Sequence, residues 1–196
     1  MAFWSENHGN NPGLKDPKRN FRFRVEFQGI DGGGNGPSLW MAKTAAKPSF
    51  AISAAEHKYL NHTFYYPGSV TWNDITVTMV DPNDPDMSAT MAAIVQEGGY
   101  KPPSDAQDLQ TMSKATAVNA LGQVIITQMD AEGNDLERWT LWNAFITDLK
   151  FGDTLAYGDE NLTELSVTLK YDWARIETPQ GKSSATINQD AEFFKS

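Results

Sequence analysis

The run Leu162-Thr-Glu-Leu-Ser-Val-Thr-Leu-Lys-Tyr-Asp-Trp173 decides the fold class of this chain. Apolar side chains occupy every second position and polar ones fall between them: Leu165, Val167, Leu169, Tyr171 and Trp173 against Glu164, Ser166, Thr168, Lys170 and Asp172. Successive side chains of a β-strand point to opposite faces, so this pattern predicts one long strand with an apolar and a polar face. The polar face is expected either to contact solvent or to line an enclosed space.

A second β-rich run, Val70-Thr-Trp-Asn-Asp-Ile-Thr-Val-Thr-Met-Val80, predicts a partner strand whose apolar face carries Ile75, Val77 and Met79. Alternation from Phe21 to Phe27 predicts a third strand. After a Gly-rich turn, Leu39 to Ala42 is expected to begin the second strand of that hairpin.

Two further apolar segments predict a hairpin in the second half of the chain. Gln123–Met129 and Leu136–Phe145 flank the turn Asp130-Ala-Glu-Gly-Asn134, which contains the glycine that such a turn favours. The apolar positions continue as far as a bend at Gly152.

Helical signals lie between these blocks of strand. Asp84 is expected to cap a helix, with Pro85 in its first position, and the pair Gly98-Gly99 to end it. One apolar stripe of this helix is formed by Met87, Met91, Ile94 and Val95. A capping-box pattern at Ser104 predicts a short second helix that ends near Met112.

The order of these elements predicts a mainly β (α+β) domain, a β-sandwich or barrel with one flanking α-helix. With 196 residues, the chain is expected to form one domain over residues 20–175. Residues 1–19 are expected to form an N-terminal arm and residues 176–196 a C-terminal arm.

Composition excludes several classes of protein. Hydrophobic residues make up 40% of the chain, enough for a real core. The absence of cysteine excludes disulfides, thiolate metal sites and a cysteine nucleophile. No apolar run is long enough for a membrane-spanning helix, and no signal peptide is expected at the N-terminus.

The charge is acidic and unevenly distributed. The formal net charge is −9, and the segment from Asp81 to Glu164 is the acidic part of the chain. Such a surface repels nucleic-acid phosphates, so sequence-specific DNA binding is not expected. Two interpretations stay open: a solvated surface that keeps the protein soluble, or a wall past which DNA slides without adhering.

The segment from Ala45 to Gly68 has no clear period, and is expected to be a connection of roughly twenty residues. Loops of that length inside a compact domain are uncommon and are usually functional. This one is rich in apolar side chains, so we expect it to pack against another copy of the protein. The alternative is a loop folded over its own core. The expected contact residues are Pro48, Phe50, Ile52, Tyr59, Phe64 and Tyr65.

Candidate catalytic and metal-binding groups are few. The three histidines are His8, His57 and His62, and no Gly-x-Ser-x-Gly element presents a serine. His57 and His62 match no zinc-binding spacing. The acidic run Asp81–Asp86 fits a helix start better than a calcium loop. An acid-site carbohydrate-binding or hydrolytic β-sandwich stays open as a distant alternative, because two carboxylates can converge from anywhere in a fold.

Several segments, in this order, resemble the tail tube proteins of contractile-tailed bacteriophages, the myovirus major tail tube protein family. They are Ala42–Pro48, Tyr66–Pro82 with the strand Trp72–Met79, Trp142–Leu149, and Tyr157–Tyr171. The resemblance covers about residues 20–175. The chain departs from the family pattern at Asn143, where a proline is expected, and in its longer terminal arms.

The resemblance implies a structural protein, with no enzymatic activity and no cofactor or metal. Six subunits would close their sheets into one ring-shaped β-barrel, and rings would stack into the inner tube of the tail. The polar positions Glu164, Ser166, Thr168, Lys170 and Asp172 would then face the lumen. The apolar segment between Pro48 and Tyr66 would join neighbouring rings.

The resemblance also implies partners and a location. The partners are other copies of the chain, the tail sheath protein, and the baseplate and tail-terminator proteins. The tape measure protein and DNA would pass through the lumen without specific binding, and no membrane insertion is implied. The protein would reside in the virion, after assembly in the cytoplasm of the bacterial host. Within the class, a baseplate tube initiator or the tube protein of a type VI-like injection system is an open alternative.

Overall fold

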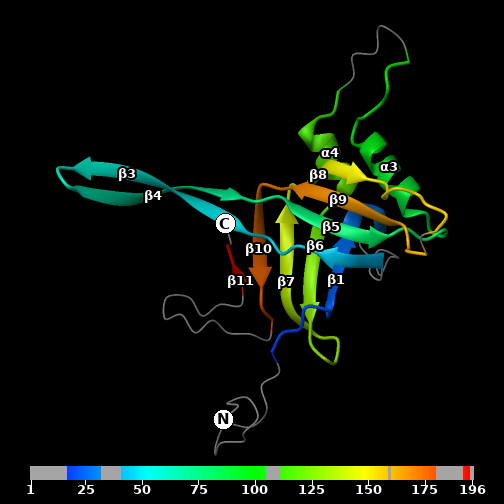
Figure 1. Ribbon diagram of the computed structural model, residues 1–196, viewed down its shortest axis with the longest axis horizontal. Coiled ribbons are helices and arrows are strands. Elements are labelled where there is room, and N and C mark those ends of the chain that lie inside the picture. Colours follow the sequence, from blue (N-terminus) through cyan, green and yellow to red (C-terminus); the bar gives the residue numbers. More distant parts are fainter. Residues whose placement is uncertain (1–16, 32–40, 105–110, 159, 180–191, 195–196) are drawn as a thin grey trace, which may run out of the picture.

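The computed structural model describes residues 17–31, 41–104, 111–158, 160–179 and 192–194. Its body consists of two β-sheets, and a long two-stranded hairpin projects from it (Figure 1). The five-stranded sheet has the order β1 (Phe23–Phe27), β6 (Val124–Met129), β7 (Asp135–Trp142), β10 (Trp173–Glu177) and β11 (Glu192–Phe193). The four-stranded sheet has the order β2 (Ala42–Ala45), β5 (Ile75–Val80), β9 (Glu164–Lys170) and β8 (Phe145–Lys150).

The two sheets pack face to face around one hydrophobic core. Val25 and Phe27 come from the first sheet, Val77 and Val167 from the second, and all four are fully buried. In Figure 1 the strands of one sheet cross those of the other at a wide angle. The predicted mainly β class is therefore confirmed, and neither sheet closes into a barrel among the strands that the structure describes.

The predicted long strand from Leu162 to Trp173 is in fact two strands. Its apolar face is buried as expected through Leu165, Val167 and Leu169, but β9 ends at Lys170 and β10 begins at Trp173 in the other sheet. The chain turns a corner at Tyr171 and Asp172, where the two sheets meet. The alternation of burial changes phase at this corner: Tyr171 is buried, but Trp173, which was predicted on the apolar face, is exposed, and Ala174 is buried in its place. The phase changes because the chain turns into the other sheet between Lys170 and Trp173.

The predicted strand from Val70 to Val80 is also divided. β4 ends at Trp72, and β5 pairs with β9 from Ile75 onward. The two intervening residues, Asn73 and Asp74, mark the boundary between the projecting hairpin and the body.

The predicted hairpin of Phe21–Phe27 with Leu39–Ala42 is wrong. β1 pairs with β6, whereas β2 pairs with β5 in the other sheet. The predicted hairpin after residue 123 is confirmed as β6 and β7. Its second strand stops at Trp142, because Asn143 adopts a left-handed conformation (φ 55°), and the chain continues as β8 in the four-stranded sheet.

The prediction of one flanking helix is also wrong, because two helices flank the sheets: α3 (Met87–Glu97) packs against α4 (Lys114–Leu121), and α4 packs against β8 (Figure 1). A four-residue α1 (Gln28–Asp31) follows β1. α3 starts later than expected: Asp86, not Asp84, caps it by accepting a hydrogen bond from the Ala89 N–H at 2.8 Å. Gly99, with φ 107°, follows its end as predicted. The helix expected between Ser104 and Met112 lies largely outside the described residues.

The segment expected to be an irregular loop is a regular β-hairpin. β3 (Phe50–Tyr59) and β4 (His62–Trp72) pair antiparallel along their length, with one register shift between Ile52 and Ala54. We call this hairpin the arm. Apart from Trp72 at its base, every residue of the two strands is exposed. The hairpin was not predicted because both of its faces are exposed, so its sequence lacks the alternation of apolar and polar residues that marks a half-buried strand.

No helix within the described ranges is long and apolar enough to cross a membrane.

Candidate functional site

The two outer strands of the four-stranded sheet, β2 and β8, are candidate assembly edges. No described strand pairs with the outer side of either one. Such an edge presents unpaired N–H and C=O groups that another chain can complete. β2 is four residues long, and β8 carries an irregularity between Ile146 and Asp148. Both edges are therefore short, as natural proteins favour where uncontrolled pairing must be avoided.

The outward face of the four-stranded sheet is polar, and it carries two ion pairs. Thr76 and Thr168 lie opposite each other on β5 and β9, with their hydroxyl oxygens 3.3 Å apart. The Lys170 Nζ lies 3.3 Å from the Asp74 carboxylate, and Lys43 forms an ion pair with Glu164. Asp148 and Lys150 of β8 lie on the same face, opposite Thr168 and Ser166. The face therefore presents hydroxyls together with charged groups of both signs.

The residues predicted to line a lumen do not all occupy the same position. Glu164, Ser166, Thr168 and Lys170 alternate with the buried residues of β9, so they share the outward face. Asp172 lies beyond the end of β9. Its carboxylate accepts hydrogen bonds from Lys114 on α4 at 2.7 Å and from the Asn143 side chain at 2.7 Å. These contacts lower the pKa of Asp172, and they fasten the corner between the two sheets.

The arm carries large apolar side chains on both faces. Tyr66 lies opposite Ala55 and Phe64 opposite His57, whereas Tyr65 lies opposite Glu56 on the other face. The exposed large residues of the arm are Phe50, Ile52, Tyr59, Leu60, Phe64, Tyr65, Tyr66 and Val70. Of the predicted contact residues, only Pro48, which precedes the arm, is buried. An exposed apolar surface of this extent is typical of a protein–protein contact.

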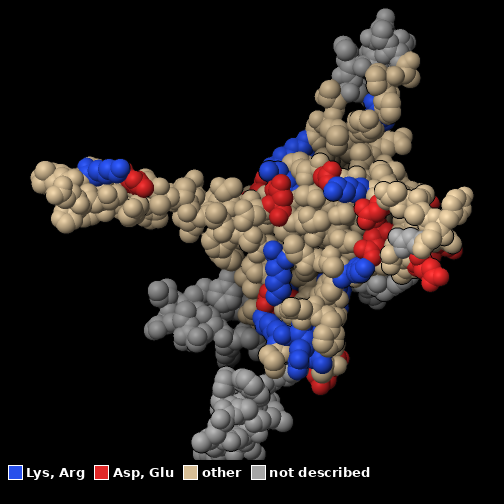
Figure 2. All heavy atoms as spheres, in the orientation of Figure 1, with Lys and Arg blue, Asp and Glu red and all other residues tan. Residues whose placement is uncertain are grey.

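A second exposed apolar segment lies in the connection between β8 and β9. Phe151, Leu155, Tyr157 and Leu162 are all more than half exposed. In Figure 1 this connection lies at the opposite end of the molecule from the arm. Figure 2 shows acidic side chains gathered on this side, whereas lysine and arginine gather at the lower end of the body.

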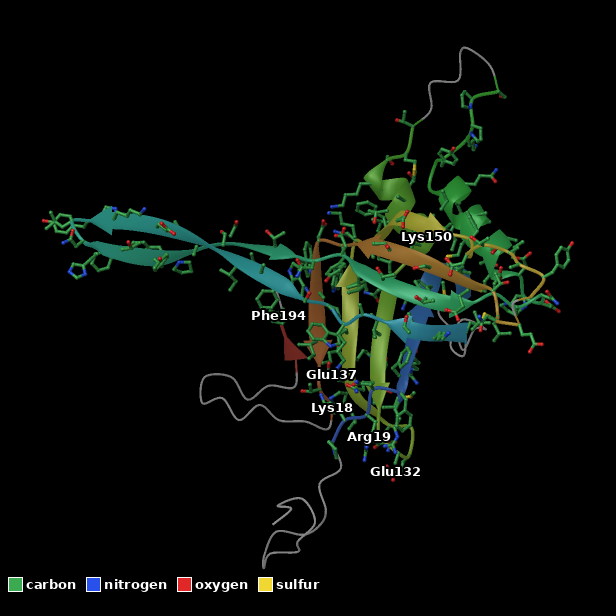
Figure 3. The ribbon with its side chains drawn as sticks, viewed as in Figure 1. Lys18, Arg19, Glu132, Glu137, Lys150 and Phe194 are labelled. Atoms are coloured by element: carbon green, nitrogen blue, oxygen red, sulfur yellow. The ribbon has the colours of Figure 1, made fainter. Side chains whose placement is uncertain are left out.

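The segment between β2 and β3, which leads into the arm, is held in place by a buried carboxylate, Glu137 on β7. It pairs with Lys18 (Figure 3). It also pairs, at 2.8 Å, with Lys47, which precedes the arm. Burial by itself would raise the pKa of Glu137, but hydrogen bonds from Lys18, Lys47 and Trp139 lower it to about 2. The carboxylate is therefore charged at neutral pH, and it ties the N-terminal segment and the β2–β3 connection to the five-stranded sheet.

The structure brings together no evident catalytic constellation in its described part. His57 and His62 lie on the exposed arm, and no group of three His, Asp or Glu side chains is placed to hold a metal ion within the described ranges. Hollows on the described surface are open, such as the groove lined by Tyr100, Met112 and Leu149 beside the helices.

Sequence reasoning missed the two assembly edges, the Glu137 cluster and α4. Edges cannot be recognised before the strand order is known. For α4 there was a signal: Ser113 accepts a hydrogen bond from the Thr116 N–H at 3.2 Å, and the Thr116 hydroxyl accepts one from the Ser113 N–H at 3.3 Å. This is a capping box with threonine in the third helical position.

No protein-family model and no curated protein matches the sequence. Solved structures do match the fold. A chain in the cryo-EM structure of the anti-feeding prophage (AFP) baseplate has a TM-score of 0.60 at 14% identity, over 86% of this chain and 100% of that chain. A chain in the PVC sheath/tube terminator of an extracellular contractile injection system has a TM-score of 0.58 at 15% identity, over 85% of this chain and 100% of that chain.

A chain in the PVC sheath–tube complex in its extended state has a TM-score of 0.57 at 15% identity, over 84% of this chain and 94% of that chain. At such identities a match concerns the fold. All three matches come from contractile injection machines or phage-like particles, and they span nearly the whole length of the matched chains. The chain therefore shares its fold with components of contractile injection systems, as its resemblance to tail tube proteins predicted.

Proposed function

We propose that this protein is the subunit of the inner tube of a contractile phage tail, in which hexameric rings stack into a hollow conduit for DNA delivery. One observation carries the proposal: the four-stranded sheet is apolar on its core face and polar on its outward face, and no described strand pairs with either of its outer edges. A sheet of this kind is suited to form a segment of a wall that other copies complete.

Ring closure follows from the order of the strands. All neighbours in the sheet β2-β5-β9-β8 are antiparallel. With an even number of strands, β8 of one subunit runs antiparallel to β2 of the next, so the same hydrogen-bonding pattern continues around the ring. Closure removes both exposed edges of the four-stranded sheet. The outward face, with Glu164, Ser166, Thr168 and Lys170, then lines the lumen.

Stacking uses the two apolar ends of the molecule. Since the arm and the β8–β9 connection lie at opposite ends, head-to-tail stacking brings the arm of one ring against the connection of the next (Figure 1). A heterologous contact of this kind propagates into a filament. The contact residues on the arm are Phe50, Ile52, Tyr59, Phe64 and Tyr65, whereas the buried Pro48 positions the arm.

In this role the partners are the sheath, baseplate and terminator proteins, with the tape measure protein and DNA inside the lumen. The protein is assembled in the cytoplasm of the bacterial host and resides in the virion. The acidic net charge of −9 on each subunit supports a bore that does not hold phosphate. The matches to an AFP baseplate structure and to injection-system structures support a second candidate, a baseplate tube initiator or the tube protein of a phage-like injection system.

Ring closure is tested by cross-linking, because the chain has no cysteine of its own. In the double variant Thr44→Cys/Asp148→Cys, one exposed cysteine lies on each edge strand. Mild oxidation is expected to give a ladder of covalent oligomers that ends at six. The matched control, Thr44→Cys/Lys58→Cys, moves the second cysteine to the arm and should give no such ladder. A protein that stays monomeric in both variants contradicts the proposal.

Negative-stain electron microscopy separates the two candidates. A tube subunit is expected to polymerise by itself into hollow tubes of variable length, whereas an initiator stops at single rings until a tube protein is added. A persistent monomer that binds or cleaves a glycan would instead favour the carbohydrate-active β-sandwich.

A further inference from the structure

The C-terminal segment carries a side chain that no role has yet explained. β11 adds to the edge of the five-stranded sheet, with Ile176 paired to Phe193 and Glu177 to Glu192. The next residue, Phe194, leaves the sheet, and its side chain lies where the arm joins the body (Figure 3). We propose that Phe194 is a brace that fixes the direction of the arm.

Phe194 contacts both strands of the arm at their base. Phe50 and Trp72 form the first residue pair of the hairpin. The Phe194 ring meets Phe50 at 5.9 Å and Trp72 at 5.8 Å, measured between ring centroids, and both contacts are edge-to-face. Phe50 and Trp72 themselves lie 5.0 Å apart. Edge-to-face packing is a favoured arrangement for aromatic rings, so the three rings form one cluster.

The backbone of Phe194 supports a specific role for this residue. Its φ is 62°, in the left-handed region that a bulky side chain rarely adopts. Such a conformation persists where surrounding contacts stabilise it. Here the contacts are the β11 pairing on one side and the two aromatic rings on the other. The turn directs the side chain out of the sheet and toward the base of the arm.

Other contacts also hold the base of the arm. Asn73 donates its backbone N–H to the Ser49 carbonyl at 2.8 Å and its side-chain amide to the Ser49 hydroxyl at 3.0 Å. Trp72 also meets Tyr171 of the body at 5.9 Å. Beyond this point the arm is exposed on both faces, so its direction is decided at the base.

Small rotations at the base produce large displacements at the tip. β3 has 10 residues. At about 3.3 Å per residue its length is about 33 Å, so a rotation of about 10° moves the tip by about 6 Å, more than the spacing between neighbouring strands. A contact made by the tip with another subunit therefore depends on how firmly the base is held. Phe194 is thus a positioning residue for ring stacking, and this consequence depends on the proposed function.

The brace is tested by measuring where the arm points. Lys58→Cys on the arm and Lys150→Cys on β8 give two exposed sites for spin labels in a chain without other cysteines. Labelled full-length chains are diluted into unlabelled ones, so that pulsed electron resonance reads only distances within one chain. Phe194→Ala is expected at least to double the width of the distance distribution, whereas Phe194→Trp keeps it narrow. Phe21→Ala, which removes an exposed phenylalanine elsewhere, is the matched control.

The same variants are then tested for tube formation. Phe194→Ala is expected to raise the protein concentration at which tubes form about tenfold, with Phe194→Trp close to the unmodified chain. An unchanged distribution width in Phe194→Ala overturns the brace, whatever the tubes do. A doubled width with normal tubes keeps the brace and removes the arm from ring stacking. A doubled width in Phe194→Ala, together with an unmodified chain that itself forms no tubes, keeps the brace and contradicts the proposed function.

Discussion

The body and the arm are both built from regular antiparallel strands, yet their environments differ. Along β5 and β9 every second side chain is buried, whereas the residues of β3 and β4 are exposed on both faces up to Trp72. Both strand pairs are antiparallel and hydrogen-bonded, with a register shift in the arm between Ile52 and Ala54. Burial therefore separates them: the body supplies the folding free energy, and the arm is kept available for another molecule.

The comparison also explains why the arm needs a firm base. An isolated two-stranded hairpin is only marginally stable in water. The arm continues directly from β5 through Asn73 and Asp74, and its base is packed by aromatic rings. Its exposed aromatic side chains contribute little to the stability of the single chain, so substitutions there should affect assembly much more than folding.

The largest expected difference concerns the two faces of β9. Val167→Asp places an unpaired charge in the core and is expected to cost more than about 4 kcal/mol, enough to prevent folding. The neighbouring Thr168→Asp lies on the outward face and should cost about 1 kcal/mol, through its lost contact with Thr76. Circular dichroism during thermal unfolding measures both. Equal effects would show that the face assignment is wrong.

The next largest effect on the free energy of unfolding is expected at Glu137, which holds the segment between β2 and β3 against the five-stranded sheet. Glu137→Gln is expected to lower the free energy of unfolding by about 3 kcal/mol at pH 7, because Lys18 and Lys47 lose their charged partner. Its pKa is lowered from 4.5 to about 2, so this contribution is fully present above pH 4.5 and is lost as the pH falls toward 2.

Urea unfolding at several pH values measures this contribution. The difference between the unmodified chain and Glu137→Gln should shrink steadily from pH 4.5 downward. A difference that does not change with pH would mean that the carboxylate is not the stabilising group.

A smaller effect is expected from adding one methyl group in either region. At Gly122 in the body, φ is 69° and a Cβ would lie 2.5 Å from the backbone nitrogen of Gly29, so Gly122→Ala should cost about 2 kcal/mol. At Gly68 in the arm, a Cβ would meet the Ser53 hydroxyl, an exposed side chain that can turn away, and its nearest backbone atom would be the Ser53 carbonyl oxygen at 3.2 Å. Gly68→Ala should therefore cost less than about 1 kcal/mol. Similar losses in thermal unfolding would remove the distinction between body and arm.

The smallest effect on folding and the largest on assembly are expected at the outer part of the arm. Phe64→Asp with Tyr65→Asp places charge on both faces and should change the free energy of unfolding by less than about 0.5 kcal/mol, while tubes are lost. Sedimentation combined with circular dichroism measures both properties. Lys58→Gln on the same arm is the control and should still form tubes. Normal tubes from the double variant would show that the arm does not join the rings.

The sequence predicted well wherever one side of an element is buried. Alternation identified the core face of β9, and the apolar stripe of α3 was recognised from Met87, Met91 and Ile94, all of which are buried. The strands of the arm were not predicted, because both of their faces are exposed. A register shift after Ile52 and the pair Pro67-Gly68 also interrupt their pattern. The lumen and inter-ring surfaces stay predictions, since both require more than one copy of the chain.

The amino-acid sequence by itself determined the fold class and the apolar and polar faces of the main strands, because the period of side-chain burial is a local property. The tertiary structure alone decided which strands pair, where the chain crosses from β9 to β10, and which edges stay open. Those features depend on contacts between residues far apart in the chain, such as β1 with β6 and Phe194 with Trp72. These contacts stabilise the protein only once the two sheets have packed together, so a local sequence pattern does not predict them.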